Sequence, residues 1–409
     1  MLEPFPTLDP VLVGQRLVEA RKAVGLTQED AASQLGCSRP VFIAIEKGTR
    51  SAKPEEIIKL ARLYGRKVHE VVGTTQPVTD WQPHFRTAVA KHGDKVASLE
   101  LNEAAEALQR FAGNYMELAK MTRTTLPTNY PDEVSLERYR LNIAQLAEDI
   151  ATRERQRLGL GDQPIADLRE IMENAVGIKT LYYPMPSNIA GMYGFIGEAG
   201  CCVMINCKHP RTRRRLTAAH EYAHTIVDRH RPGIDLTVQS GKRPPNERFA
   251  EIFGSAILLP ASGVSRQFNE VLMASGDFQV ADLCRMANYY DVSIDALCYR
   301  LEGMGLLPVG TMNTLREGKF RKRDAFRSLE LAEPTPGKND RRFPARYYQL
   351  AVTAYNKGDI SEGQLAKYLD CDPVRAREIV FEMSNPSVME GNETGVWQVA
   401  LENTLLAKG

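Results

Sequence analysis

The chain has no long apolar run, no export signal and no cysteines at C-x-x-C spacing. No apolar stretch approaches the length of about 18 residues that a membrane-spanning helix needs. The start, Met1-Leu2-Glu3-Pro4, lacks a basic segment followed by an apolar one. Its seven cysteines are odd in number, which favours free thiols in a reducing compartment. We therefore expect a cytoplasmic protein that makes no membrane contact.

The chain also has no excess of either charge. Its net charge is +1, so any nucleic-acid contact must use a local basic patch rather than the field of the whole protein. At 409 residues it is longer than one ordinary hydrophobic core supports, which indicates several domains.

Histidine is scarce, with seven in 409 residues, yet two of them stand four apart in His220-Glu221-Tyr222-Ala223-His224. On a helix, such residues share a face about 5–6 Å apart at Cβ, close enough to chelate one small cation. The glutamate after the first histidine can take a proton from a water. This H-E-x-x-H pattern is typical of zinc-dependent peptide hydrolysis. We predict His220 and His224 as metal ligands and Glu221 as general base; the alternative is two surface histidines on an amphipathic helix.

The flanking sequence places the motif in mid-helix. Residues 200–206 form a short apolar run that predicts a buried strand. A helix from Thr212, as N-cap, to about Asp228 follows, and Pro232-Gly233 ends it. Its expected buried side consists of Leu216, Ala219, Ala223, Ile226 and Val227.

A catalytic zinc needs a third protein ligand. Asn246 is expected to cap a helix from Glu247 to Leu259, and Glu247 and Glu251 share one face of it. We predict that Glu247 ligates the metal and that Glu251 accepts a hydrogen bond from a ligating histidine's free ring N–H. His230 is the alternative third ligand, although it lies off the face of His224.

These segments resemble a known family, the ImmA/IrrE metallopeptidases, over roughly residues 165–310. Arg213–Glu221, Glu247–Phe253 and Leu258-Leu259-Pro260 follow its R-x-F-T-x-A-H-E-x-x-H, E-x-x-A-N-x-F-A and L-L-M-P patterns. The departures are Leu216 for the usual Phe, Glu251 for Asn and Leu259 for Met. The resemblance implies the same three ligands and general base, and cleavage of repressor-type regulators rather than of proteins at large.

The first 72 residues predict a bundle of five short helices with tight stops. The expected helices are 14–24, 28–35, 39–47, 54–64 and 68–72. Thr27 and Ser38 are expected N-caps, and Gly36 turns the chain between the second and third helix. Leu26-Thr27-Gln28-Glu29, Leu35-Gly36-Cys37-Ser38 and Ile45-Glu46-Lys47-Gly48 closely resemble the XRE (Cro/repressor-type) helix-turn-helix family.

By that resemblance, the partner is double-stranded DNA. The expected phosphate contacts are Gln28, Arg39, Lys47, Arg50 and Lys53. Val41 and Ile43 stand at positions of the recognition helix, 39–47, that face base edges. Ile43 and Ala44 are apolar where polar or basic residues are usual, so base discrimination would rest on Arg39 and Val41. The alternative is a helical module that docks a protein.

The sequence therefore predicts a multidomain protein: an all-α N-terminal helix-turn-helix, a helical spacer, an α+β zincin-like metallopeptidase core and helical C-terminal modules. The predicted domains are 8–73 (helix-turn-helix), 84–160 (spacer), 161–270 (peptidase core), 271–310 (a helix-turn-helix-like module) and 338–385 (a small helical module). Two apolar stripes of the spacer, 101–118 and 136–150, predict an antiparallel hairpin or a homodimer seam, and packing within the chain is the preferred interpretation. Residues 153–157 resemble a solvated charged face.

The leading functional hypothesis is a DNA-binding regulator that carries a site-specific zinc endopeptidase. It would cleave a repressor-type or toxin-linked partner in trans, or itself within the linker 74–83. Tyr193 and Tyr222 are candidate hydrogen-bond donors to the developing oxyanion. A nearby sheet edge is expected to bind the substrate as an extra strand, which a proline placed within 203–205 would test. The main alternative is a non-catalytic transcription factor or antitoxin with a structural or sensory metal site. A weaker one is a general peptidase.

Overall fold

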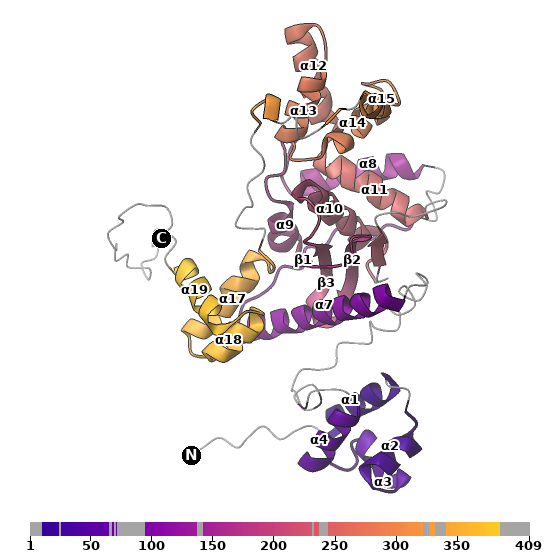
Figure 1. Ribbon diagram of the computed structural model, residues 1–409, viewed down its shortest axis with the longest axis vertical. Coiled ribbons are helices and arrows are strands. Elements are labelled where there is room, and N and C mark those ends of the chain that lie inside the picture. The colour runs from indigo at the N-terminus through magenta and orange to yellow at the C-terminus, as the bar shows by residue number, and fades with distance from the viewer. Residues whose placement is uncertain are drawn as a thin grey trace, which may run out of the picture. The chain divides into compact units, whose positions relative to one another are not determined.

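The computed structural model divides the chain into two compact units, residues 1–80 and 81–409, which are described separately (Figure 1). The structure describes residues 10–23, 26–64, 68, 71, 95–136, 142–230, 233–236, 244–318, 320–321, 325, 327–331 and 341–384. The predicted multidomain α+β architecture is confirmed, while the finer division of residues 84–385 stays a prediction.

The N-terminal unit contains α1 (Pro10–Ala23), α2 (Gln28–Leu35), α3 (Arg39–Glu46) and α4 (Pro54–Leu63). Thr27 and Asp30 cap α2 reciprocally, since each side chain accepts a hydrogen bond from the other's backbone N–H. Gly36 ends α2 at φ 82°, a left-handed conformation that suits glycine. Leu17, Phe42, Ile45 and Leu60 form the core of the unit. The first four predicted helices are thus confirmed, and most of the fifth lies outside the described residues.

The second unit is built on a four-stranded sheet. The strands are β1 (Lys179–Tyr183), β2 (Ile189–Ile196), β3 (Gly200–Asn206) and β4 (Gly233–Leu236), in the order β1-β3-β2-β4. β3 pairs with β1 in parallel and with β2 antiparallel, and β4 pairs antiparallel with β2. The strand predicted at 200–206 is therefore an interior strand. The proposed proline in 203–205 would break the sheet rather than test a substrate-binding edge.

Helices cover both faces of this sheet (Figure 1). On one face lie α10 (Arg211–Val227), α11 (Pro245–Leu258) and α8 (Ile143–Arg157), of which α11 contacts both others. On the other lies α7 (Lys95–Met121), which contacts β1 and β3. The predicted helix at 165–175 is α9 (Leu168–Ile171), which continues as a π-helical turn, η2 (Met172–Val176).

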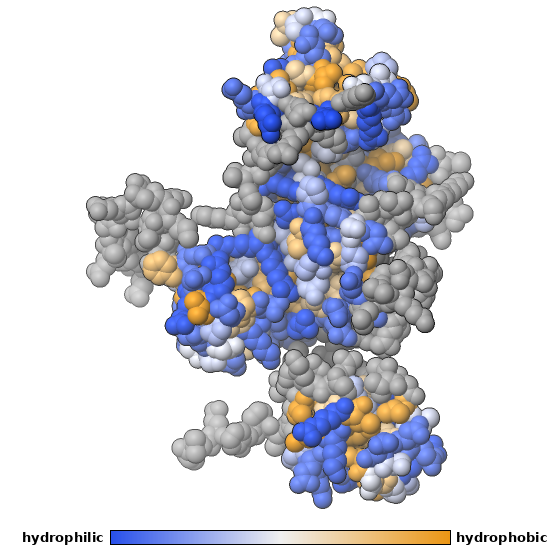
Figure 2. Space-filling view, viewed as in Figure 1, coloured by the Kyte–Doolittle hydropathy of each residue, from blue (hydrophilic) through white to orange (hydrophobic). Residues whose placement is uncertain are grey.

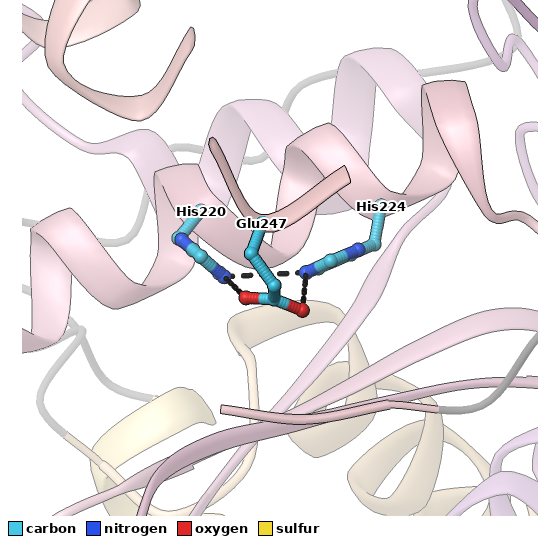
Figure 3. A group of neighbouring side chains, drawn as sticks. All are labelled: His220, His224 and Glu247. Atoms are coloured by element: carbon cyan, nitrogen blue, oxygen red, sulfur yellow. Dashed lines mark hydrogen bonds and ion pairs between the residues drawn. The ribbon is translucent and has the colours of Figure 1, made fainter. Parts of the chain in front are cut away.

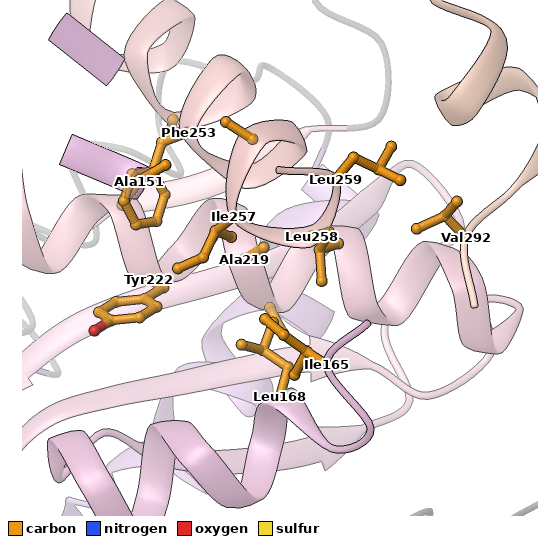
Figure 4. Packing of buried hydrophobic residues seen from close by; sticks show 14 of the residues in the cluster. Ala151, Ile165, Leu168, Ala219, Tyr222, Phe253, Ile257, Leu258, Leu259 and Val292 are labelled. Atoms are coloured by element: carbon orange, nitrogen blue, oxygen red, sulfur yellow. The ribbon is translucent and has the colours of Figure 1, made fainter. Parts of the chain in front are cut away.

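The core lies between the sheet and α8, α10 and α11. Figure 4 shows part of it, including Ala151 of α8, Tyr222 of α10 and Phe253 of α11. Two details of the predicted motif helix were wrong. Pro210, not Thr212, is the N-cap of α10, and Leu216 is 36% exposed because it lies outside the face that packs on the sheet.

The described helices of the spacer pack within the chain, as preferred, but against other elements and not on each other as a hairpin. The apolar stripe of α7 is buried within the chain against the sheet and against α17 (Ala345–Asn356), with Phe111 stacked on Phe343. α8 packs on α11 instead. The expected solvated face at 153–157 is also partly wrong, because Glu154 and Arg155 are buried, and Arg155 donates to backbone carbonyls, including that of Gly161 at 2.7 Å.

The remaining helices are α12 (Ala261–Ser275), α13 (Val280–Tyr289), α14 (Ile294–Gly303), α15 (Thr311–Glu317), α18 (Glu362–Tyr368) and α19 (Pro373–Ser384). The α13–α14 and α18–α19 pairs repeat the turn of α2–α3. Asp291 and Asp370 take the place of Gly36, with φ of 51° and 49°. On the face in Figure 2, apolar residues gather over the N-terminal unit and the α12–α14 end. No helix in the described part of the chain combines the length and apolar character of a membrane span.

Candidate metal centre

Three predicted ligands converge between α10 and α11 (Figure 3). His220 Nε2 lies 3.2 Å from His224 Nε2 and 3.3 Å from a Glu247 carboxylate oxygen. The other Glu247 oxygen lies 3.8 Å from His224 Nε2. The two imidazoles are buried, and the Glu247 side chain is 18% exposed. The i, i+4 spacing aligns the histidines on one helix, and packing of the next helix brings in the carboxylate.

The donor set fits a divalent cation. Donor atoms at about 2.0–2.1 Å from a tetrahedral zinc ion lie about 3.3–3.4 Å from one another. The separations of 3.2 and 3.3 Å are close to this spacing, and the second Glu247 oxygen lies 3.8 Å from His224 Nε2. Two neutral imidazoles and a carboxylate are also the protein ligands of one type of catalytic zinc site, in which the fourth position stays open. Among the described residues, this is the group of three that meets the geometry of a metal site.

Glu247 is held in its ionised form. Burial favours the neutral carboxyl, but the hydrogen bond from His220 and the charges of the two histidines outweigh it, so the pKa of Glu247 lies below its usual value. An ionised carboxylate is the form that binds a metal.

A second carboxylate, which we did not predict, supports the site. Asp228 Oδ2 lies 3.3 Å from His224 Nδ1, and Asn246 Nδ2 donates to the same oxygen at 2.8 Å. A proton on Nδ1 leaves the Nε2 lone pair of His224 directed at the centre. Asp228 stands four residues after His224, a spacing that could have identified it. Asn246 was expected to cap α11, but the helix starts at Pro245 and Pro244 is its N-cap. The side-chain amide of Asn246 instead donates to Asp228.

The predicted role of Glu251, accepting from a ligating histidine, stays a prediction. Asp228 already engages the Nδ1 of His224, so His220 is the histidine to which that prediction now applies.

Two glycines that we did not predict shape the site. A Cβ on Gly254 of α11 would lie 3.2 Å from the backbone nitrogen of His220, so its absence lets α10 and α11 approach closely. Gly254 is seven residues after Glu247 and lies on the same side of the helix. A Cβ on Gly191 of β2 would lie 2.5 Å from Glu221 Oε1. The carboxylate of Glu221, which is 1% exposed, therefore occupies the space that Gly191 leaves open.

The other candidate residues lie elsewhere. His230 is exposed and contacts the ring of Phe195 edge-on, outside the group of three donors. The Tyr222 hydroxyl donates to Glu154 at 2.6 Å within the core, so it is not an oxyanion donor. The Tyr193 hydroxyl donates to the backbone carbonyl of Arg229 at 2.7 Å, although its ring lies 6.1 Å from that of His224.

In the N-terminal unit, the predicted DNA contacts lie on or beside α2–α4. Arg39 is exposed, and Val41 and Ile43 are partly exposed on α3. Lys47 follows α3, and Lys53 precedes α4. Three predicted contacts have partners within the unit: Gln28 donates to Glu46 at 2.7 Å, Arg50 pairs with Glu56 at 2.9 Å, and the exposed Arg39 pairs with Glu29 at 3.6 Å. Their contact with DNA stays a prediction.

Comparison with known proteins assigns both regions. Residues 173–302 match the IrrE N-terminal-like domain and residues 12–72 match a helix-turn-helix domain. The chain is 32% identical over 69 residues to the cryptic phage CTXphi transcriptional repressor RstR of Vibrio cholerae, covering 17% of this chain and 62% of the repressor. It is 44% identical over 46 residues to an uncharacterised HTH-type transcriptional regulator of Methanocaldococcus jannaschii, covering 11% of this chain and 70% of that protein.

The crystal structure of ComR from Streptococcus suis aligns over 94% of this chain and 96% of its own at 11% identity. The TM-score is 0.15, too low to indicate a shared fold. The two family matches confirm the predicted combination of domains, and the predicted metal ligands and Glu221 all lie within the IrrE-like region.

Proposed function

From the premise that this chain belongs to the HTH-type transcriptional regulators and carries an IrrE-like peptidase domain, we propose that it is a DNA-binding regulator with a site-specific zinc endopeptidase. The observation that carries the proposal is the convergence of His220, His224 and Glu247. Glu221, the residue after His220, has a buried carboxylate. Repressor-type relatives of the N-terminal unit support DNA as one partner.

Zinc bound at this site would supply Lewis-acid polarisation of a water and of a peptide carbonyl. His220, His224 and Glu247 would hold the ion, and Asp228 would set the tautomer of His224. Glu221 takes the proton of the attacking water and then delivers it to the leaving amine. On the sheet side, Gly191 leaves open the space that this carboxylate occupies.

The substrate we propose is a repressor-type or toxin-linked regulator, cleaved in trans, or the chain itself within the linker 74–83. Residues 1–80 form a compact unit of their own, and this supports a regulatory role for cleavage between the two units. A single cut there would detach the DNA-binding unit from the rest of the chain.

The test compares wild type with Glu221→Gln, which keeps all three metal ligands. Both are expressed in the same host, zinc content is measured, and new protein N-termini are identified by labelling and mass spectrometry. We expect equal zinc content and a small set of new N-termini with wild type alone. A new N-terminus within 74–83 indicates self-cleavage, and one in another protein identifies the partner.

Equal sets of N-termini in the two strains would refute the peptidase. Zinc binding and DNA binding without cleavage would instead favour the alternative, a non-catalytic regulator or antitoxin with a structural or sensory metal. Many cuts in unrelated proteins would indicate a general peptidase.

A further inference from the structure

A pocket of about 310 Å³ lies at the end of α7, on the sheet face away from α10. It is lined by Met116, Ala119, Lys120, Arg123, Thr124, Thr125, Leu126, Thr128, Lys179 and Glu198. Its volume is at the lower end of the range of about 300–1,000 Å³ for small-molecule sites. Neither the metal centre nor the helix-turn-helix contributes a lining residue, so the proposed function gives this pocket no role.

The loop 122–129, which follows α7 and forms one wall, is held in place. A Cβ on Gly177, which follows η2 with φ of 99°, would lie 2.2 Å from the carbonyl oxygen of Pro127. The loop therefore lies in close contact with the turn after η2. The backbone N–H of Asn129 donates to Val176 at 3.0 Å, and its side-chain amide donates to Ala175 at 3.1 Å. The pocket is therefore a preformed feature of the fold.

Lys179 of β1 is buried and forms no ion pair with a carboxylate of the described residues, although the charge of Glu173 acts on it from a greater distance. It is 4% exposed, and its Nζ donates to the Gly177 carbonyl at 3.2 Å and lies 5.6 Å from the centre of the Tyr115 ring. Within the described ranges, no carboxylate lies within ion-pair distance of this ammonium. Burial lowers the pKa of Lys179. A buried charge is costly unless it is paired, so this lysine needs an explanation.

Arg123 is the second unusual cation. It follows α7 with φ of 54°, a left-handed conformation in which glycine is the usual residue after a helix. The backbone there is well ordered, since the Thr124 N–H donates to Ala119 at 2.9 Å. Glycine at this position would avoid the backbone cost that Arg123 carries.

The charges of the pocket favour an anion. Three cationic side chains line it, and its single carboxylate, Glu198, is already paired with Lys120 at 2.6 Å. We propose that this pocket binds a small dianion, a phosphate monoester or dicarboxylate of metabolite size. Lys179 and Arg123 hold its charged oxygens, and Met116, Ala119 and Leu126 contact its carbon skeleton. Threonine hydroxyls at the rim supply further donors.

The test uses the full-length chain and four probes at millimolar concentration: inorganic phosphate, glycerol 3-phosphate, succinate and the neutral control glycerol. Binding is measured by calorimetry and by the shift in melting temperature. We expect at least one of the three anions to bind and glycerol not to bind. The anion that binds best distinguishes free phosphate, a phosphate ester and a dicarboxylate as the source.

Two variants make the test specific, because both should stabilise the protein while weakening binding. Lys179→Met removes an unpaired buried charge, and Arg123→Gly relieves the left-handed backbone. Each should raise the melting temperature without ligand and weaken anion binding about tenfold or more, the effect of losing one charge-assisted hydrogen bond. Glu330→Gly is the matched control, since Glu330 also has positive φ, 49°, and lies outside the pocket lining.

Glu330→Gly should bind the anion like wild type. If no anion binds, or if both variants bind as tightly as wild type, the proposal is wrong. Lower melting temperatures of both variants would also contradict it, because the two cations would then serve the fold itself.

Discussion

Removing the Asp228 side chain tests how the metal centre is supported. In Asp228→Ala, His224 Nδ1 loses its acceptor at 3.3 Å and Asn246 loses the oxygen to which it donates at 2.8 Å. The three metal ligands are unchanged. His224 can then rotate and exchange tautomers, so we expect weaker zinc binding with the full number of ligands still present.

The magnitude follows from the two hydrogen bonds involved. Loss of a residue that orients a metal ligand weakens metal binding about 10–100-fold, or about 1.4–2.7 kcal/mol. Both bonds end on the same oxygen, Oδ2. Asp228→Asn can therefore keep both with its amide oxygen and lose only the charge. We expect Asp228→Asn to fall between wild type and Asp228→Ala.

The assay is competition between the protein and a zinc chelator of known affinity, with melting curves of the metal-free and zinc-bound forms. The gain in stability on adding zinc should shrink by the same free energy as the binding. The zinc affinity of Glu251→Gln is measured in the same way. This variant tests the sequence-based prediction that Glu251 accepts a hydrogen bond from one of the two histidines.

Wild-type zinc affinity in Asp228→Ala would refute the orienting role of Asp228. An equal loss of stability in the metal-free and zinc-bound forms would show a structural role without effect on the metal. A loss in Glu251→Gln alone would restore the sequence-based assignment.

Two further predictions concern other contacts. Gly191→Ala places a Cβ 2.5 Å from Glu221 Oε1, where ordinary contact starts at 3.4 Å. The Glu221 carboxylate must then move by roughly 1 Å, which should lower the cleavage rate about 100-fold with zinc content unchanged. A wild-type cleavage rate would show that the position of Glu221 does not depend on this space. Glu46→Ala leaves the buried Arg21 without the partner it holds at 2.7 Å, and should destabilise the N-terminal unit by about 3–5 kcal/mol in thermal melts. The exposed Glu29–Arg39 pair is the control, since Glu29→Ala should change little, and equal effects of the two would contradict the argument.

Local patterns predicted much of this protein correctly. The helices α2, α3, α10 and α11 and strand β3 were identified to within a few residues, because caps, glycine stops and apolar periodicity act over one or two turns. The two histidines could be placed on one face for the same reason, since i, i+4 spacing is a property of a single helix.

Predictions failed where the partner of an element mattered. The stripe of α7 was recognised as apolar, but periodicity does not tell a dimer seam from the α17 and sheet contacts that bury it. Glu154 and Arg155 were expected in solvent because charge suggests exposure, yet distant partners such as Tyr222 satisfy them in the core.

The sequence by itself determined the kinds of domain and the helical spacing of His220 and His224, and it predicted Glu247 as the third member of the group. Only the tertiary structure decided the distances at the metal centre, the support from Asp228, the close approach at Gly254 and the space at Gly191 that receives Glu221. The physical reason is that helical spacing follows from the backbone within one element. The approach of two helices and a strand depends on side chains far apart in the chain, whose packing leaves no periodic signal in the sequence.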